Sequence, residues 1–164
     1  MTTLLKNLSD YDPENIPSAE KMKFGIVVSE WNSEITEGMY DGAYQTLIKN
    51  GAKPKNIFKI YVPGSFELTF AGKLFAEQKV VDAVIALGCV VQGETRHFDF
   101  ICQGITQGIT ELNLKYDIPF VFGILTTENQ QQARDRSGGI YGNKGDEAAI
   151  TAIKMIALKR DFKK

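Results

Sequence analysis

The sequence predicts an α/β protein, a three-layer α/β/α sandwich in which helices cover both faces of a parallel sheet of about four strands. Four short apolar runs, rich in β-branched residues, lie at residues 24–29, 57–62, 80–87 and 119–125. Near-continuous apolar runs are typical of parallel strands that are buried on both faces. Segments with helical periodicity alternate with these runs, and right-handed crossovers then place helices on both sides of the sheet.

Each predicted strand is followed by a predicted helix. Residues 35–47 carry an apolar side chain at every fourth position, and Asn32 or Ser33 can cap the start of that helix. Gly104 and Gly108 share one face of the third helix, where small residues allow close packing. The remaining helices are expected over residues 68–77, 101–116, 128–136 and 147–159.

Composition narrows the class of protein. The chain has 164 residues, 43% of them hydrophobic, which suits one domain with a substantial core. Its 19 basic and 20 acidic residues give a net charge of -1 without any block of like charge, which favours neither nucleic acid nor a membrane surface as a partner. Cys89 and Cys102 lie in apolar patterns, so a cytoplasmic protein without disulfides is expected. With one histidine, the sequence predicts no metal site and no cofactor.

The N-terminal residues differ from the rest of the chain. Residues 1–22 are rich in Asn, Asp, Pro and Ser, and we expect an extension with little structure of its own. Leu4, Leu5 and Leu8 are the side chains that could attach it to the domain. Residues 23–164 are predicted to form that single domain.

Unusual residues gather where the predicted strands end. In open parallel sheets, ligands bind beyond the carboxyl ends of the strands. We therefore expect a pocket for a flat polar ring and an anion at this edge. The residues expected there are Trp31, Asn32, Ser65, Phe66, Glu67, the segment from Cys89 to His97, and Phe122.

Each of these residues also has a simpler structural explanation. Trp31 could cover the edge of the sheet, Ser65 could cap a helix, and His97 could be a structural histidine near a helix start. Arg136 and Lys144 could be solvated surface charges. No GxxxxGK[ST], GxGxxG or GxSxG motif is present to decide the chemistry. The coincidence of these residues at one sheet edge is what favours a functional site.

Three motifs resemble those of the lumazine synthase family. They are PGSFE at 63–67, GETRHFDF at 93–100 and RSGGIYGNKG at 136–145, and the similarity extends over about residues 23 to 160. It implies a flavodoxin-like sheet and a transferase that condenses 5-amino-6-(D-ribitylamino)uracil with 3,4-dihydroxy-2-butanone 4-phosphate. The product would be 6,7-dimethyl-8-ribityllumazine, formed in the penultimate step of riboflavin biosynthesis.

The resemblance also implies a role for each motif residue. His97 would be the catalytic proton carrier, and Asn32, Lys144 and Glu147 would support the site. The pyrimidine and ribityl chain would be bound by Trp31, Ser65, Phe66, Glu67, Cys89, Val90, Val91 and Phe122. The butanone phosphate would be bound by Glu94, Thr95 and Arg136. Glu94 would act through its backbone N–H with its carboxylate turned away, and Gln92 stands where many relatives carry a basic residue.

The family further implies assembly. Five subunits would form a ring with active sites between neighbours, and twelve rings could build a 60-subunit shell, with riboflavin synthase as a further partner. The face with Gly104 and Gly108 is expected to contribute apolar surface to that assembly. Two other functions share the fold: a non-catalytic flavin or lumazine carrier, and a flavodoxin-like electron carrier. The electron carrier is disfavoured because SEWNSE, at 29–34, lacks a hydroxyl-rich phosphate loop.

Overall fold

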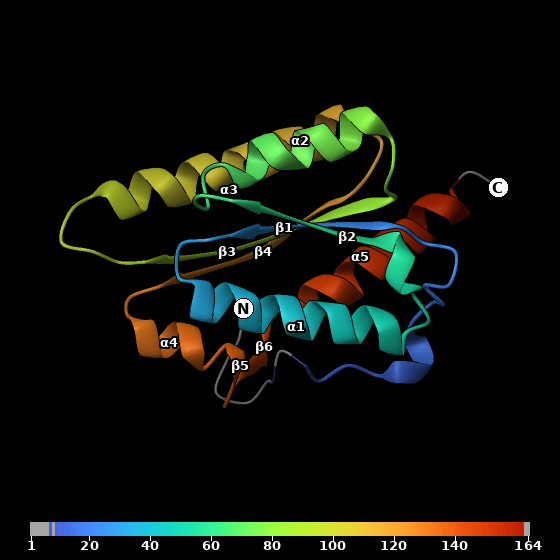
Figure 1. Cartoon of the computed structure of the whole chain (residues 1–164), viewed down its shortest axis with the longest axis horizontal. Coiled ribbons are helices and arrows are strands. Elements are labelled where there is room, and N and C mark those ends of the chain that lie inside the picture. The colour runs from blue at the N-terminus through green and yellow to red at the C-terminus, as the bar shows by residue number, and fades with distance from the viewer. Residues whose placement is uncertain (1–6, 8, 163–164) are drawn as a thin grey trace.

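The computed structural model describes residue 7 and residues 9–162. It is a three-layer sandwich, as the sequence predicts, in which α1, α4 and α5 cover one face of the sheet and α2 and α3 cover the other (Figure 1). The sheet has four parallel strands in the order β2-β1-β3-β4. Their bounds are β1 Phe24–Ser29, β2 Ile57–Val62, β3 Ala83–Val91 and β4 Phe120–Thr127.

The third strand departs from the sequence prediction, which placed it at residues 80–87. β3 starts later, because Val80 is exposed, and it continues to Val91. Its last residues remain in the sheet because they pair with β4, from Cys89 opposite Leu125 to Val91 opposite Thr127. The strand therefore reaches beyond its apolar run, into the segment that carries the candidate site.

Helices fill the connections. Their bounds are α1 Ser33–Lys49, α2 Leu68–Gln78, α3 His97–Lys115, α4 Gln130–Arg134 and α5 Lys144–Asp161. α4 is shorter than the predicted helix at 128–136: the side chain of Asn129 caps it, accepting a hydrogen bond of 2.9 Å from the N–H of Gln132. α5 begins earlier than predicted because the side chain of Asn143 accepts a bond of 2.8 Å from the N–H of Gly145.

A small hairpin between α4 and α5 was not predicted from the sequence. It consists of β5, Ser137–Gly139, and β6, Gly142–Asn143, which pair antiparallel. Gly138 and Gly142 have φ values of +118° and +82°, which side-chain-bearing residues rarely adopt. The glycines of RSGGIYGNKG therefore shape this hairpin.

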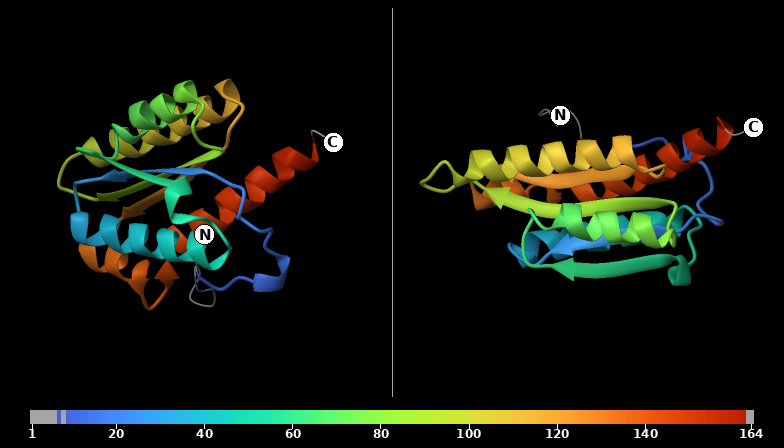
Figure 2. Two further views of the ribbon diagram at one scale, coloured as in Figure 1. Left: turned by 45° about the vertical axis from the view of Figure 1, so that its right-hand side comes forward. Right: turned by 90° about the horizontal axis from the view of Figure 1, so that it is seen from above.

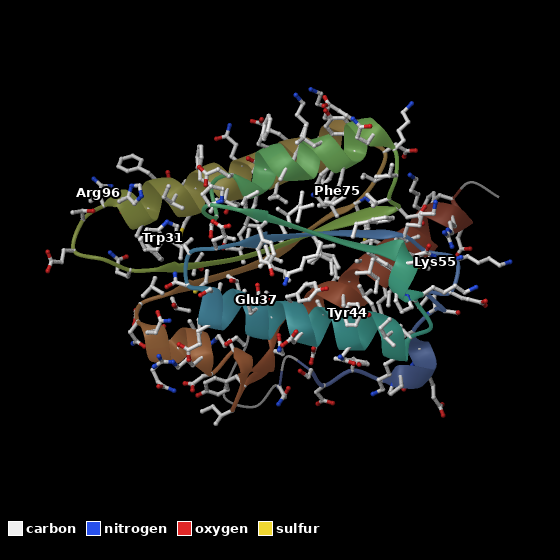
Figure 3. All side chains as sticks on the ribbon, viewed as in Figure 1. Trp31, Glu37, Tyr44, Lys55, Phe75 and Arg96 are labelled. Carbon is white, nitrogen blue, oxygen red and sulfur yellow. The ribbon has the colours of Figure 1, made fainter. Side chains whose placement is uncertain are left out.

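Two hydrophobic cores hold the layers together. Phe24 and Ile26 of β1 face α1 and α5, while Val27 faces α2 and α3. On the second face, Phe75 points from α2 toward the sheet (Figure 3), and its ring lies 2.8 Å from the position that a Cβ would take at Gly25. The glycine of β1 is what allows α2 to pack so closely.

The glycine face of α3 packs within the chain. Helices α2 and α3 lie side by side over the sheet (Figure 2). A Cβ at Gly104 would lie 2.9 Å from the ring of Phe66, and one at Gly108 would lie 2.6 Å from the side chain of Thr69. The expectation of close packing is confirmed. The expectation that this face contributes surface to an assembly is wrong, because the chain's own α2 segment occupies it.

The described part of the N-terminal segment runs along the outside of α1 (Figure 1). Pro13–Asn15 form a short 3-10 helix, and Ala19 and Met22 are buried in the core beside α1. Leu4, Leu5 and Leu8 lie outside the described residues. Within the described part of the chain, none of the helices is long and apolar enough to span a bilayer.

Candidate active site

The four connections that follow the strands meet at one edge of the sheet, on the left of Figure 1. A cavity of about 580 Å³ opens there between the β1–α1 loop, the β2–α2 loop and the start of α3. We call it the histidine cavity, and its lining is Trp31, Asn32, Gly64, Ser65, Phe66, Glu67, Cys89, Val90, Val91, His97 and Ile101. The structure thus brings nine of the sequence-derived candidates together within one chain.

Two exposed aromatic rings stand in the wall of the histidine cavity. The side chain of Trp31 is 73% exposed and that of Phe66 is 53% exposed. Trp31 lies at the same end of the molecule as Arg96, just before α3 (Figure 3). With this exposure, Trp31 covers little of the sheet edge in a single chain. Its ring is available to stack on a flat ligand.

The end of β3 presents backbone to the cavity. The pairing of β1 with β3 ends at Val28 opposite Leu87. β3 continues to Val91, so Cys89 and Val91 have no β1 residue opposite them. The carbonyl of Cys89 accepts a bond of 3.0 Å from the side-chain amide of Asn32. Because backbone direction alternates along a strand, the N–H and C=O of Val91 face the same way as those of Cys89. Burial raises the pKa of the Cys89 thiol to about 11, so the thiol is neutral and offers no nucleophile.

An unpaired hydroxyl lies in the same wall. Ser65 is buried, and its Oγ has no hydrogen-bond partner among the described residues. The prediction that Ser65 caps a helix is wrong, because α2 begins at Leu68 and Glu67 holds the cap position without a side-chain bond. A Cβ at Gly88 would lie 2.6 Å from the Ser65 Oγ, so the glycine of β3 makes room for it. Buried polar atoms without a partner commonly mark a ligand or water position.

His97 is the first residue of α3 and is exposed in the cavity wall. Its backbone N–H donates to the Thr95 hydroxyl over 3.4 Å, which shapes the turn before the helix. Glu94 and Thr95 are exposed at the tip of this turn and lie outside the lining of the cavity. The helix start leaves backbone N–H groups that attract anions.

Phe122, Lys144 and Glu147 lie elsewhere. They line a second cavity of about 290 Å³ between β4, the end of α3 and α5, which we call the lysine cavity. Lys144 Nζ and the Glu147 carboxylate form an ion pair at 2.9 Å. The expectation that Phe122 joins the other candidates at the strand ends is therefore wrong for a single chain: Phe122 sits in the middle of β4, lines the lysine cavity and packs against the core beneath α2 and α3.

Arg136 follows α4 and lines neither cavity. Its Nη1 donates to the carbonyl of Gln132 at 2.9 Å, and its guanidinium lies 4.7 Å from the centre of the Tyr141 ring. The carbonyl of Arg136 accepts a 2.8 Å bond from the N–H of Lys144. Among the residues that the structure describes, no carboxylate forms an ion pair with Arg136. The cation is held in place and remains available to an anion.

Similarity to known proteins decides the family. A family model described as 6,7-dimethyl-8-ribityllumazine synthase matches residues 21–160. The chain belongs to the lumazine synthase family.

Relatives in this family match the chain almost end to end. The 6,7-dimethyl-8-ribityllumazine synthase of Parabacteroides distasonis is 63% identical over 156 residues, covering 95% of this chain and 98% of the relative. That of Phocaeicola vulgatus is 57% identical over 164 residues, covering 100% of this chain and 98% of the relative. That of Flavobacterium johnsoniae is 55% identical over 160 residues, covering 98% and 84%.

Some residues that line the two cavities were not found from the sequence. Gly64 and Ile101 line the histidine cavity, and Ile101 lies one helical turn after His97, a spacing that could have identified it. Asn113 lines the lysine cavity and exchanges two side-chain bonds of 2.9 Å with the backbone of Phe120, which fixes the start of β4. In the described part of the chain, no three His, Cys, Asp or Glu side chains gather in a group that could hold a metal ion.

Proposed function

We propose that the protein condenses 5-amino-6-(D-ribitylamino)uracil with 3,4-dihydroxy-2-butanone 4-phosphate to give 6,7-dimethyl-8-ribityllumazine, as a transferase of riboflavin biosynthesis. Membership of the family supports this reaction. The single observation that carries it is the histidine cavity, which combines exposed aromatic rings, an unpaired hydroxyl and the only histidine of the chain.

The pyrimidine substrate fits the walls of the histidine cavity. The face of Trp31 stacks on the uracil, and the backbone of Val91 and Val90 reads the edge of the ring. The ribityl chain is a polyol and needs partners that donate and accept hydrogen bonds. The unpaired Ser65 hydroxyl and the Glu67 carboxylate supply them, and the ring of Phe66 closes that side.

The phosphate of the second substrate binds beside the start of α3. Backbone N–H groups of Glu94 and Thr95 and the Thr95 hydroxyl face an anion there, assisted by the helix dipole. Arg136 adds a bidentate fork that holds the phosphate as it becomes the leaving group. Gln92 has no charge role: its amide donates to the carbonyl of Gly93 at 2.8 Å.

His97 moves the protons. The amine of the pyrimidine adds to the ketone, water leaves to form an imine, phosphate is eliminated, and the ribityl-bearing nitrogen closes the ring with loss of a second water. Each step transfers a proton, and an imidazole can serve both as general base and as general acid. No covalent bond to the protein is required, so much of the rate comes from holding the two substrates together.

The complete site is shared between neighbouring subunits. Among the described residues, no lysine or arginine lines the histidine cavity, whereas Phe122 and Lys144 line the separate lysine cavity. A head-to-tail ring brings the histidine cavity of one subunit against Phe122, Arg136, Lys144 and Glu147 of the next. We assign the protein to a cytoplasmic pentamer, a ring that could remain alone or join eleven others in a shell, with riboflavin synthase as the proposed further partner.

A direct assay tests the proposed function. The purified protein is mixed with both substrates, and the absorbance of the lumazine product is followed against a protein-free reaction. We expect the protein to accelerate product formation, and omission of the butanone phosphate to abolish it. A protein that binds the lumazine product without forming it would be a carrier, and the proposal would be wrong.

A further inference from the structure

The loop between β1 and α1 contains a residue in an unusual backbone conformation. Asn32 has φ 59° and ψ 44°, the left-handed region, in which asparagine is tolerated better than other side-chain-bearing residues. Its carbonyl starts α1 by accepting from the N–H groups of Ile35 and Thr36 at 2.9 and 3.1 Å. Its side chain makes no cap, contrary to the sequence prediction. The left-handed backbone instead directs the amide away from the helix.

The Asn32 amide connects two walls of the histidine cavity. Its Nδ2 donates to the carbonyl of Cys89 at 3.0 Å, where β3 has passed the end of β1. The other backbone bonds of this loop go toward β2: Glu30 N–H to the carbonyl of Val62 at 2.8 Å, and Trp31 N–H to the carbonyl of Pro63 at 3.2 Å. Within the described residues, Asn32 therefore supplies the loop's hydrogen-bonded link to the end of β3.

We propose that Asn32 is a positioning residue that fixes the Trp31 ring relative to the backbone edge of β3. The inference rests on the proposed function, since a pyrimidine must meet the face of Trp31 and the edge of Val91 at the same time. Without the link, the hydrogen bonds that join the Trp31 loop to a neighbouring strand go to the β2 side alone, and the 73% exposed Trp31 has little packing to orient its ring. The Cys89 carbonyl also loses its hydrogen-bond donor. It then becomes a free acceptor beside the edge of the pyrimidine ring.

The variant Asn32→Gly removes the amide and keeps the left-handed backbone accessible. We expect it to weaken binding of the pyrimidine by about 5- to 100-fold, the range for a buried acceptor left unpaired. The KM for the butanone phosphate should change by less than about twofold, because an uncharged group remote from the phosphate has been removed. Asn32→Ala adds backbone strain to the same loss and should also lower the melting temperature.

Trp31 is the only tryptophan of the chain, so its emission reports on this loop alone. Titration with 6,7-dimethyl-8-ribityllumazine should quench the emission of the unaltered protein. In Asn32→Gly, time-resolved anisotropy of Trp31 should show faster local motion, and the quenching should require correspondingly more lumazine. The melting temperature of this variant should fall no further than that of Asn50→Gly, which loses the same kind of bond, and this comparison separates positioning from a general loss of stability.

Asn50→Gly is the matched control. Asn50 caps the other end of α1, and its Nδ2 donates to the carbonyl of Thr46 at 2.8 Å, the same kind of bond outside the histidine cavity. Its loss should leave both lumazine binding and Trp31 anisotropy unchanged. Equal lumazine affinity and equal anisotropy in Asn32→Gly and the unaltered protein would overturn the inference. Failure of the unaltered protein to bind lumazine at all would instead overturn the proposed function on which the inference rests.

Discussion

The histidine cavity and the lysine cavity differ in what they can do to a phosphorylated substrate. The first, of about 580 Å³, offers aromatic rings, backbone, a hydroxyl and a histidine, but none of its described lining residues is a lysine or an arginine. The second, of about 290 Å³, offers Phe122 and the ion pair between Lys144 and Glu147. Elimination of phosphate needs a cation near the developing charge. The difference supports the proposal that one chain carries two complementary parts of a site, which meet where two subunits join.

The largest loss of activity is expected from substitution of His97 in the histidine cavity. His97→Ala should lower kcat by about 10²- to 10⁴-fold, because general acid–base assistance is lost while the substrates still bind together. Steady-state assays give kcat, and lumazine quenching of Trp31 should show affinity within about twofold of the unaltered protein. Unchanged turnover at saturating substrate would mean that His97 is structural.

Substitution of Arg136 should affect the binding of one substrate and not the other. Arg136→Ala should raise the KM for the butanone phosphate by about 10- to 100-fold, the loss of a charge-assisted contact, and leave the KM for the pyrimidine near its original value. Arg134→Ala is the matched control, since Arg134 lies in α4 but is paired with Glu34 at 2.9 Å. Equal weakening toward both substrates would contradict a dedicated phosphate role for Arg136.

A smaller effect should separate a ligand-binding hydroxyl from a structural one. Ser65 and Thr127 both carry buried hydroxyls without a partner in the described chain, but only Ser65 lines the histidine cavity. Ser65→Ala should weaken lumazine binding by about 3- to 10-fold, the loss of one hydrogen bond, without lowering stability. Thr127→Val should leave binding unchanged. Calorimetric titration and thermal unfolding measure both properties, and unaltered lumazine affinity in Ser65→Ala would remove that hydroxyl from the ribityl site.

A further effect concerns the dependence of stability on pH. Burial raises the pKa of the Cys89 thiol to about 11, above the value of about 8.5 for an exposed thiol. The folded protein therefore binds a proton that the unfolded chain has already lost, and stability falls as pH rises from about 8.5 toward 11. Denaturant titrations across this range should show the fall in the unaltered protein and a smaller fall in Cys89→Ala. Identical pH profiles for the two proteins would contradict the assignment of a neutral, buried thiol.

The sheet was the part of the fold that the sequence predicted well. β1 and β2 match their predicted ranges because each is a continuous apolar run that ends where a loop begins. β3 was misplaced because its last residues are held by pairing with β4, a long-range contact that no local pattern reveals. The hairpin β5–β6 was missed because two- and three-residue strands rich in glycine have no periodicity.

The composition of the site was easier to predict than its geometry. The rule that ligands bind beyond the carboxyl ends of parallel strands identified most residues of the histidine cavity, because the loops after parallel strands meet at one edge of the sheet. It failed for Phe122, since a side chain in the middle of β4 faces a helix and not the strand ends. Residue type also suggested helix caps for Asn32 and Ser65. Neither side chain makes a cap, and both residues line the histidine cavity. Residue type indicates which interactions a side chain can make. The direction of that side chain depends on the backbone conformation, which the sequence pattern did not reveal.

Complementation between two inactive variants tests most directly whether the two parts join across a subunit boundary. Equal amounts of His97→Ala and Arg136→Ala chains are unfolded together, refolded and assayed for lumazine formation. A site is intact where an Arg136→Ala chain supplies His97 and its neighbour, a His97→Ala chain, supplies Arg136. Random mixing around a closed ring gives about one half times one half, so about a quarter of the activity of the unaltered protein should return. Activity no higher than the mean of the two parent variants would place both residues in the same subunit's site and contradict the shared site.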